Sequence, residues 1–202
     1  MHPPTDGDTD LVSGRDLDIL KVIEEEGLES FSFEGLKRRV GAHPETLSRA
    51  LDRLEEKSIV ERATDGYRLT PKGREHLMVR PAELAGERMT LLKTMLPPHL
   101  VPEQLSKVLK GKWFGNLRWL GFSQGDGELV MKWVTDDGRV QLDAKFTRSE
   151  LTIEGRLLQG NNLATAVTAA HQLLAHISKS YARTGYGRVL LAEVLPPYFA
   201  SN

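Results

Sequence analysis

The chain lacks cysteine and has no long apolar run. Without cysteine it can form neither disulfide bonds nor thiolate metal sites. No stretch approaches the roughly 18 uninterrupted apolar residues of a membrane-spanning helix. Residues 1–10 are rich in proline and aspartate and contain no apolar run, so they do not have the pattern of a secretory signal. We therefore expect a cytoplasmic protein with no membrane partner.

An overall excess of positive charge is also missing. The chain has 27 basic and 28 acidic residues, which argues against a protein whose whole surface coats nucleic acid. The distribution is uneven, however. Residues 1–30 contain two basic and nine acidic side chains, whereas residues 31–80 contain eleven basic and eight acidic ones. This asymmetry indicates a phosphate-facing surface within residues 31–80.

Three helices are predicted before residue 58. The first follows Ser13 and has apolar side chains at three-residue intervals. The second covers 33–40 and is closed by Gly41, and the third begins at Pro44 and runs to about Lys57. The third helix has one apolar stripe and a polar outer face. Two short helices joined by a glycine turn, the second polar on its outer face, form a helix-turn-helix.

A β-hairpin is predicted after these helices. An Asp-Gly pair at 65–66 separates two short β-prone runs, 58–62 and 67–70, and is a strong hairpin signal. Another helix is expected to begin at Pro71. Together these elements predict a winged helix-turn-helix domain over residues 13–80, preceded by a disordered tail over 1–12.

The segments HPETLSRALDRLEEKSIVER and YRLTPKGREHL resemble the recognition helix, wing and following helix of MarR- and ArsR-type winged helix-turn-helix transcription regulators, which are mostly prokaryotic. The resemblance implies that double-stranded DNA is the partner. It places Thr46, Ser48 and Arg49 at the groove. It also brings basic residues to the flanking backbone and beside the wing, namely Arg53, Lys57, Arg62 and Arg68.

Two further arginines, Arg38 and Arg39, are added as phosphate contacts because they project outward from the predicted second helix. Glu45 lies on the outer face of the third helix. It either accepts a hydrogen bond from a cytosine amino group or repels phosphate.

A connecting helix is expected over residues 81–98, where Pro97 and Pro98 end it. Its apolar residues either pack against the second domain or form a dimer seam. A homodimer is expected, because two recognition helices on a two-fold axis read two half-sites.

The pattern of residues 99–202 predicts a second domain. With this domain, the whole chain is expected to have an α+β fold. Strands are marked by alternating apolar residues and by Gly-containing turns. The expected order is a short helix at 101–110, four antiparallel strands at 117–123, 128–135, 140–147 and 151–157, a long helix at 162–182 and an optional fifth strand at 189–195.

No motif for catalysis, a cofactor or a metal is recognisable in the second domain. The six histidines never pair at the four-residue spacing that places two ligands on one helix face. We therefore expect no enzyme activity, catalytic residue, cofactor or metal. Several aromatic residues either line a pocket for a small apolar effector or belong to the core: Trp113, Phe114, Trp119, Phe122 and Trp133.

The sequence thus predicts a DNA-binding transcription regulator whose second domain serves dimerisation or effector sensing. The main alternative is a winged-helix module that docks protein or structured RNA within a larger assembly. A third hypothesis is an enzyme without a recognisable motif.

Overall fold

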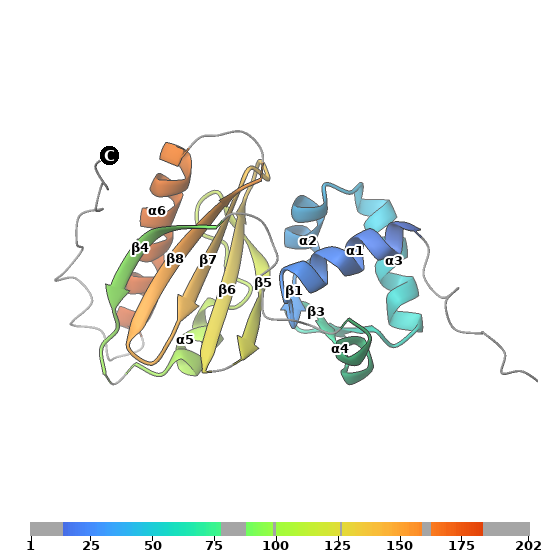
Figure 1. Ribbon diagram of the computed structural model, residues 1–202, viewed down its shortest axis with the longest axis horizontal. Coiled ribbons are helices and arrows are strands. Elements are labelled where there is room, and N and C mark those ends of the chain that lie inside the picture. Colours follow the sequence, from blue (N-terminus) through green and yellow to red (C-terminus); the bar gives the residue numbers. More distant parts are fainter. Residues whose placement is uncertain (1–13, 78–87, 99, 126, 159–162, 184–202) are drawn as a thin grey trace, which may run out of the picture.

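The computed structural model describes residues 14–77, 88–98, 100–125, 127–158 and 163–183 (Figure 1). Two separate clusters of buried apolar side chains lie within these residues. One is formed almost entirely by residues 14–77, which we call the N-terminal unit. The other is formed by residues 88–183, which we call the C-terminal unit. The α+β class is confirmed.

The N-terminal unit has the predicted order of helices and hairpin. It comprises α1 (Gly14–Glu25), β1 (Ser30–Phe31), α2 (Phe33–Val40), α3 (Pro44–Glu56), β2 (Val60–Ala63), β3 (Gly66–Leu69) and α4 (Pro71–Leu77). The Ser32 hydroxyl caps α2 by accepting a hydrogen bond from the Gly35 N–H at 3.0 Å. Gly41 ends α2 with φ of 68°, a left-handed conformation that favours glycine.

The C-terminal unit comprises β4 (Met89–Met95), α5 (Pro102–Leu109), β5 (Leu117–Gly125), β6 (Glu128–Thr135), β7 (Val140–Phe146), β8 (Glu150–Leu157) and α6 (Leu163–Tyr181). The four predicted strands and the long helix are confirmed. The connecting helix is wrong over residues 89–95, which form strand β4. Residues 81–87 of that prediction, and the optional strand at 189–195, lie outside the described residues.

Strand β4 shows why the helix prediction failed. Its residues pair in antiparallel register with β8, and a bulge between Thr90 and Leu92 shifts the alternation of side chains. Because of this shift, the apolar residues of the strand do not follow a strict two-residue period. Their sequence pattern therefore does not indicate a strand. The pairing partner lies more than 50 residues away along the chain, so tertiary contacts decided the conformation.

The sheet is larger than the four or five strands expected. Within the described residues it has eight antiparallel strands in the order β2-β3-β1-β5-β6-β7-β8-β4. The short strand β1 joins the two units, because it pairs with β3 on one side and with β5 on the other, where Ser30 lies opposite Phe122 and Phe31 opposite Gly121. The predicted hairpin of the first domain is therefore an extension of the sheet of the second.

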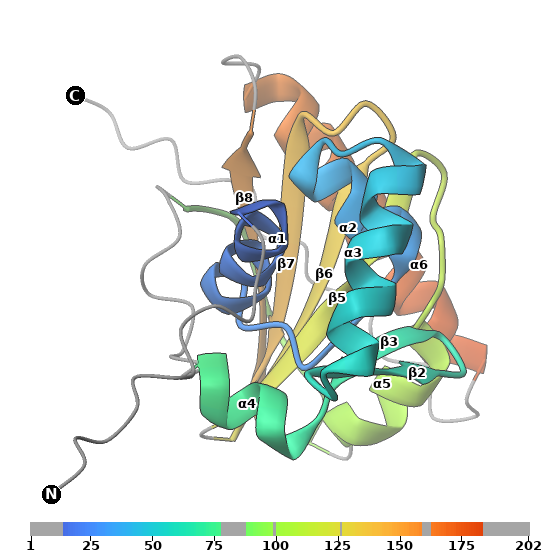
Figure 2. The ribbon, with the colours of Figure 1, turned by 90° about the vertical axis from the view of Figure 1, so that its right-hand side faces the viewer.

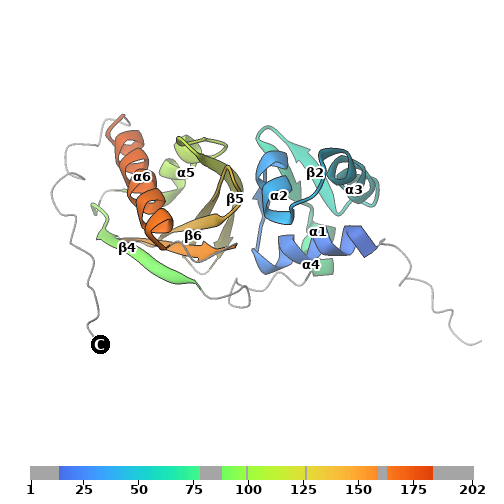
Figure 3. The same cartoon turned by 90° about the horizontal axis from the view of Figure 1, so that it is seen from above.

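The N-terminal unit and helices α5 and α6 lie on opposite faces of the β5–β8 strands. Helices α5 and α6 cover one face, and α2 packs against the other at β5 and β6 (Figure 3). Successive residues of a strand point to opposite faces, so Trp119 of β5 enters the C-terminal core while Leu120 enters the N-terminal core. Gly35 allows the close approach of α2, since a Cβ there would lie 2.3 Å from the Trp119 carbonyl oxygen.

Candidate nucleic-acid interface

Helix α3 lies on the side of the N-terminal unit that faces away from the C-terminal unit (Figures 1 and 2). Its leucines hold it on the N-terminal core, where Leu47, Leu51 and Leu54 are fully buried. Pro44 occupies its first turn, as expected. The opposite face of the helix is therefore directed away from the body of the protein.

Of the three residues predicted to lie at the groove, Arg49 is on this outer face, and Thr46 and Ser48 lie on its two flanks, next to the buried stripe. Thr46 and Ser48 are half-buried, and the Arg49 side chain is 71% exposed. Arg49 Nη2 lies 2.5 Å from the Glu45 Oε1, one turn earlier in the helix. Glu45 thus neutralises the arginine that would meet a base or phosphate, which limits non-specific attraction.

Arg53 has a positioning role in the free protein. Its Nε and Nη2 donate to the two carboxylate oxygens of Asp16, at 3.0 Å and 2.5 Å. Asp16 belongs to α1 and is almost completely buried, so this bidentate pair ties α3 to α1. The hydrogen bonds to Asp16 raise the pKa of Arg53 above its ordinary value.

The two arginines of the β2–β3 hairpin also have carboxylate partners. Arg62 lies 3.2 Å from Asp52 and 3.1 Å from Glu55, both on α3. Arg68 lies 2.6 Å from Glu61 across the hairpin. Every arginine predicted to contact DNA from α3 or the hairpin is therefore already paired with an acidic side chain.

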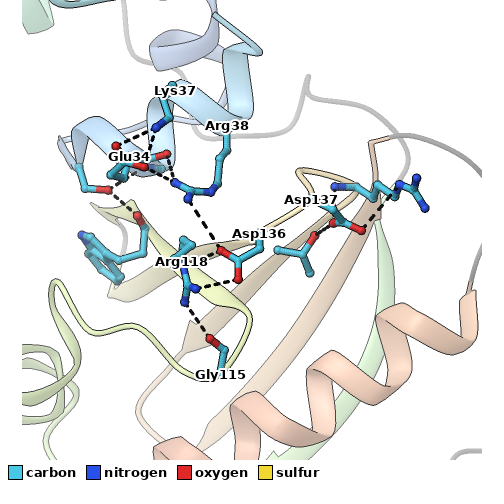
Figure 4. Close-up of polar contacts among 12 residues, drawn as sticks. Glu34, Lys37, Arg38, Gly115, Arg118, Asp136 and Asp137 are labelled. Atoms are coloured by element: carbon cyan, nitrogen blue, oxygen red, sulfur yellow. Dashed lines mark hydrogen bonds and ion pairs between the residues drawn. The ribbon is translucent and has the colours of Figure 1, made fainter. Parts of the chain in front are cut away.

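Arg38 is placed between the two units instead of on the α3 surface. It pairs with Glu34 of its own helix at 2.6 Å, and it lies 3.8 Å from Asp136 in the β6–β7 turn. Asp136 also binds Arg118 of β5, at 2.6 Å, and thus links α2 to the C-terminal unit (Figure 4). We leave Arg38 out of the candidate interface because these partners occupy it and turn it inward.

Arg39 also lies between the units, in a cluster of buried charges that we call the interunit network. Its Nη2 lies 3.0 Å from Glu26, and its Nε donates to the Gln141 side chain at 3.1 Å. Glu26, at the end of α1, is fully buried. Arg39 is therefore also left out of the candidate interface. The members of the network are Glu26, Arg39, Arg88, Lys132, Gln141, Asp143 and Arg156.

Glu26 and Asp143 are the two carboxylates of the network. Glu26 lies 2.6 Å from Arg156 and 3.6 Å from Lys132, and Asp143 lies 2.8 Å from Lys132. The Gln141 amide donates to both carboxylates, at 2.8 Å and 2.9 Å. Charges buried to this extent are tolerated only when they are paired and hydrogen-bonded.

The network holds both carboxylates in their charged form. Burial by itself raises the pKa of Glu26, but Lys132, Arg156 and the Gln141 hydrogen bond outweigh burial and the repulsion from Asp143. The pKa of Glu26 is therefore lowered. For Asp143, burial is outweighed by the attraction of Lys132 and Arg88, and its pKa is lowered as well.

The aromatic residues considered as a pocket lining pack mainly on one another. The ring centroids of Trp119 and Trp133 are 5.1 Å apart in an edge-to-face arrangement, and Phe114 lies 5.7 Å from Trp133. These three belong to the C-terminal core, which favours the core interpretation for them. Phe122 packs against that core, whereas Trp113 is 53% exposed. The small apolar effector stays a prediction.

Comparison with protein-family models, curated proteins and solved structures finds no match for this chain. Among the described helices, none is both long and apolar enough to cross a bilayer. Within the part of the chain that the structure describes, no three His, Asp or Glu side chains gather as a metal site would require.

Proposed function

We propose that this protein is a cytoplasmic transcription regulator that binds duplex DNA through a winged helix-turn-helix. The order α1-β1-α2-α3-β2-β3 of the N-terminal unit supports the winged-helix assignment. The observation that carries the proposal is the exposed N-terminal half of α3, where Arg49 is directed outward and Thr46 and Ser48 lie half-buried at the flanks. Its N-terminal turns are the part of a recognition helix that contacts base edges.

The acidic partners of the arginines lower the non-specific affinity of this surface for DNA. A phosphate that approaches Arg49, Arg62 or Arg68 competes with a carboxylate already in contact with that arginine. Tight binding therefore requires a DNA sequence whose base edges form hydrogen bonds with the side chains of α3. Glu45, next to Arg49, contributes to the selection by accepting from a cytosine amino group.

A homodimer completes the proposal. Two copies related by a two-fold axis present two α3 helices to two half-sites of an operator, which raises both affinity and sequence specificity. Light scattering of the full chain gives the oligomeric state. A mass of one chain at working concentrations would contradict this part of the proposal.

The test is a titration of the full chain against a selected duplex pool at several salt concentrations. Affinity should fall with salt, and Arg49→Ala should weaken binding by about tenfold, in line with about 1–3 kcal/mol for a base contact. Arg139→Ala is the matched control, because Arg139 is also an exposed arginine paired with a neighbouring acid, Asp137, at 3.7 Å. Equal affinity of both variants and the unmodified chain would reject α3 as the reading surface.

A docking role for the same surface is the second candidate. The pairing of each arginine on α3 and the hairpin with an acid favours it, because a charge-balanced surface suits a protein partner better than a polyanion. Absence of duplex binding at low salt, where electrostatic attraction is strongest, would favour docking over DNA binding.

A further inference from the structure

The strongest local excess of positive charge in the C-terminal unit lies on residues 104–125. This segment contains Lys107, Lys110, Lys112 and Arg118 and no acidic residue. Acidic residues border it in the sequence, where Glu103 precedes it and Asp126 follows it, and Asp136 pairs with Arg118. Because Arg118 is paired with Asp136, the three lysines provide the net positive charge of the segment. We call residues 107–118 the basic segment.

The basic segment exposes two of its three lysines and one aromatic ring, and the third lysine is half-buried. Lys107 and Lys112 are exposed, and Lys110 Nζ lies 3.7 Å from the centre of the Phe122 ring. Trp113 is 53% exposed, and the guanidinium of Arg118 lies over its ring at 4.6 Å. An exposed tryptophan among lysines is unusual for a surface with only a structural role, because tryptophan is normally largely buried.

The fold holds the basic segment in a defined conformation. The buried Trp133 donates its indole N–H to the carbonyl of Lys112 at 3.0 Å, and Phe114 and Leu117 exchange two backbone hydrogen bonds of 2.9 Å. Phe114 also stacks on His176 of α6 at 4.8 Å. The lysines and Trp113 are thus presented by a loop whose backbone is fixed, which lowers the entropy that binding would cost.

The basic segment lies beside the tip of the β2–β3 hairpin. A Cβ added to Gly111 would lie 3.7 Å from the Cβ of Asp65, in the turn of the hairpin. Figure 3 shows α5, β2 and α3 one after another along the same side of the molecule. The hairpin thus brings the N-terminal unit next to the basic segment, and a duplex that extends from α3 along the hairpin would reach its lysines.

We propose that the basic segment is a second DNA-contact surface, which binds the phosphate backbone of the duplex beyond the hairpin. This inference rests on the proposed function and deepens it. Lys107, Lys110 and Lys112 supply the positive charge that the α3 surface lacks, because the arginines there are paired with acids. Trp113 packs against the sugar-phosphate backbone between these lysines. The C-terminal unit is then part of the DNA-binding surface.

The test compares two double variants of the full chain with the same change in charge. Lys107→Glu/Lys112→Glu should weaken duplex binding by at least about tenfold and lower the slope of log K against log salt by about 2, since two phosphate contacts are lost. Lys93→Glu/Arg148→Glu is the control, because both residues are exposed and lie on β4 and in the β7–β8 turn, away from the basic segment. It should change the affinity by less than about twofold.

The outcomes separate this proposal from the first one. If the unmodified chain binds duplex and Arg49→Ala weakens it, while Lys107→Glu/Lys112→Glu behaves like its control, only the basic-segment proposal is overturned. If the unmodified chain binds no duplex, both proposals are overturned. A salt slope lowered only in the basic-segment variant supports the proposal.

Tryptophan fluorescence gives an independent readout. Trp119 and Trp133 are fully buried, so Trp113 accounts for quenching by acrylamide. Duplex should protect it from the quencher, and Trp113→Phe should abolish the change without loss of folding. Quenching that stays unchanged at saturating duplex would overturn the contact at Trp113.

Discussion

The two faces of the β5–β8 strands bury different kinds of side chain. The face beneath α5 and α6 is apolar and contains Trp119, Trp133 and Leu142. The face beneath the N-terminal unit contains the interunit network around Glu26 and Lys132. Apolar burial is non-directional and stabilises each unit. Paired charges depend on geometry, so we expect the network to determine how the two units sit against each other.

Truncation of the apolar face should have the largest effect. Trp133→Ala removes a fully buried indole that contacts Trp119 and Phe114, and we expect a loss of about 3–5 kcal/mol in the free energy of unfolding. Trp113→Ala is the control, because its exposed ring should cost less than about 1 kcal/mol. Urea denaturation measures both. Equal losses would show that the apolar face is not the main source of stability.

Removal of Glu26 should come next. Glu26→Ala leaves Arg156, Lys132 and Arg39 buried with one carboxylate fewer, and a broken buried pair typically costs about 3 kcal/mol. The matched control is Glu24→Ala, an exposed position on the same helix, which should have little effect. Both are measured by urea denaturation of the full chain. A Glu26 variant as stable as the control would mean that the network contributes nothing to the contact between the units.

The close approach of α2 to β5 gives a smaller effect. Alanine normally stabilises a helix relative to glycine by about 1 kcal/mol. At Gly35 the added Cβ would meet backbone atoms of Trp119 and Leu120 at 2.3 Å and 2.4 Å, so Gly35→Ala should instead destabilise by about 1–3 kcal/mol. At Gly14 no atom lies within 4 Å, and Gly14→Ala should be neutral or stabilising. Thermal melts of the two variants should shift in opposite directions or by clearly different amounts.

Acidic pH should reduce the stability that the interunit network provides. The pKa values of Glu26 and Asp143 lie below their ordinary values of 4.5 and 3.8 in the folded protein, so the unfolded chain takes up protons first. The stability that these groups provide is complete above those values and is lost as pH falls through the lower folded pKa values. The urea midpoint should therefore decline below about pH 4.5.

Glu26→Gln tests which group is responsible for this decline. The variant should lose less stability than the unmodified chain between about pH 5 and pH 3. Identical pH profiles would assign the acid sensitivity to other carboxylates.

Local patterns were sufficient for most elements of the N-terminal unit. The cap at Ser32, the glycine at the end of α2, the proline at the start of α3 and the Asp-Gly turn each act over a few residues. For the same reason the apolar stripe of α3, and hence its outward polar face, was predictable. The two-residue alternation of β7 puts Gln141 and Asp143 on one face, although nothing local indicates what covers that face.

The prediction of Arg38 and Arg39 as phosphate contacts shows where local reasoning stops. Their outward direction from α2 was correct, but the surface opposite them is another part of the same chain, at Asp136 and Gln141. Glu26 gave no sequence signal at all, because its partners come from five other segments. The basic segment did have a signal, the absence of acidic residues over 104–125, which becomes informative once the segment is placed beside the hairpin.

The sequence alone determined the helices, the hairpin and the α+β class, because caps, turns and apolar periodicity operate between neighbours. Only the tertiary structure decided that residues 89–95 are a strand, that β1 joins both units in one sheet, and which arginines remain at the surface. Those outcomes depend on hydrogen bonds and charge pairs between residues far apart in the chain. Such contacts leave no periodic pattern in the sequence, since each partner is defined by the position of the other.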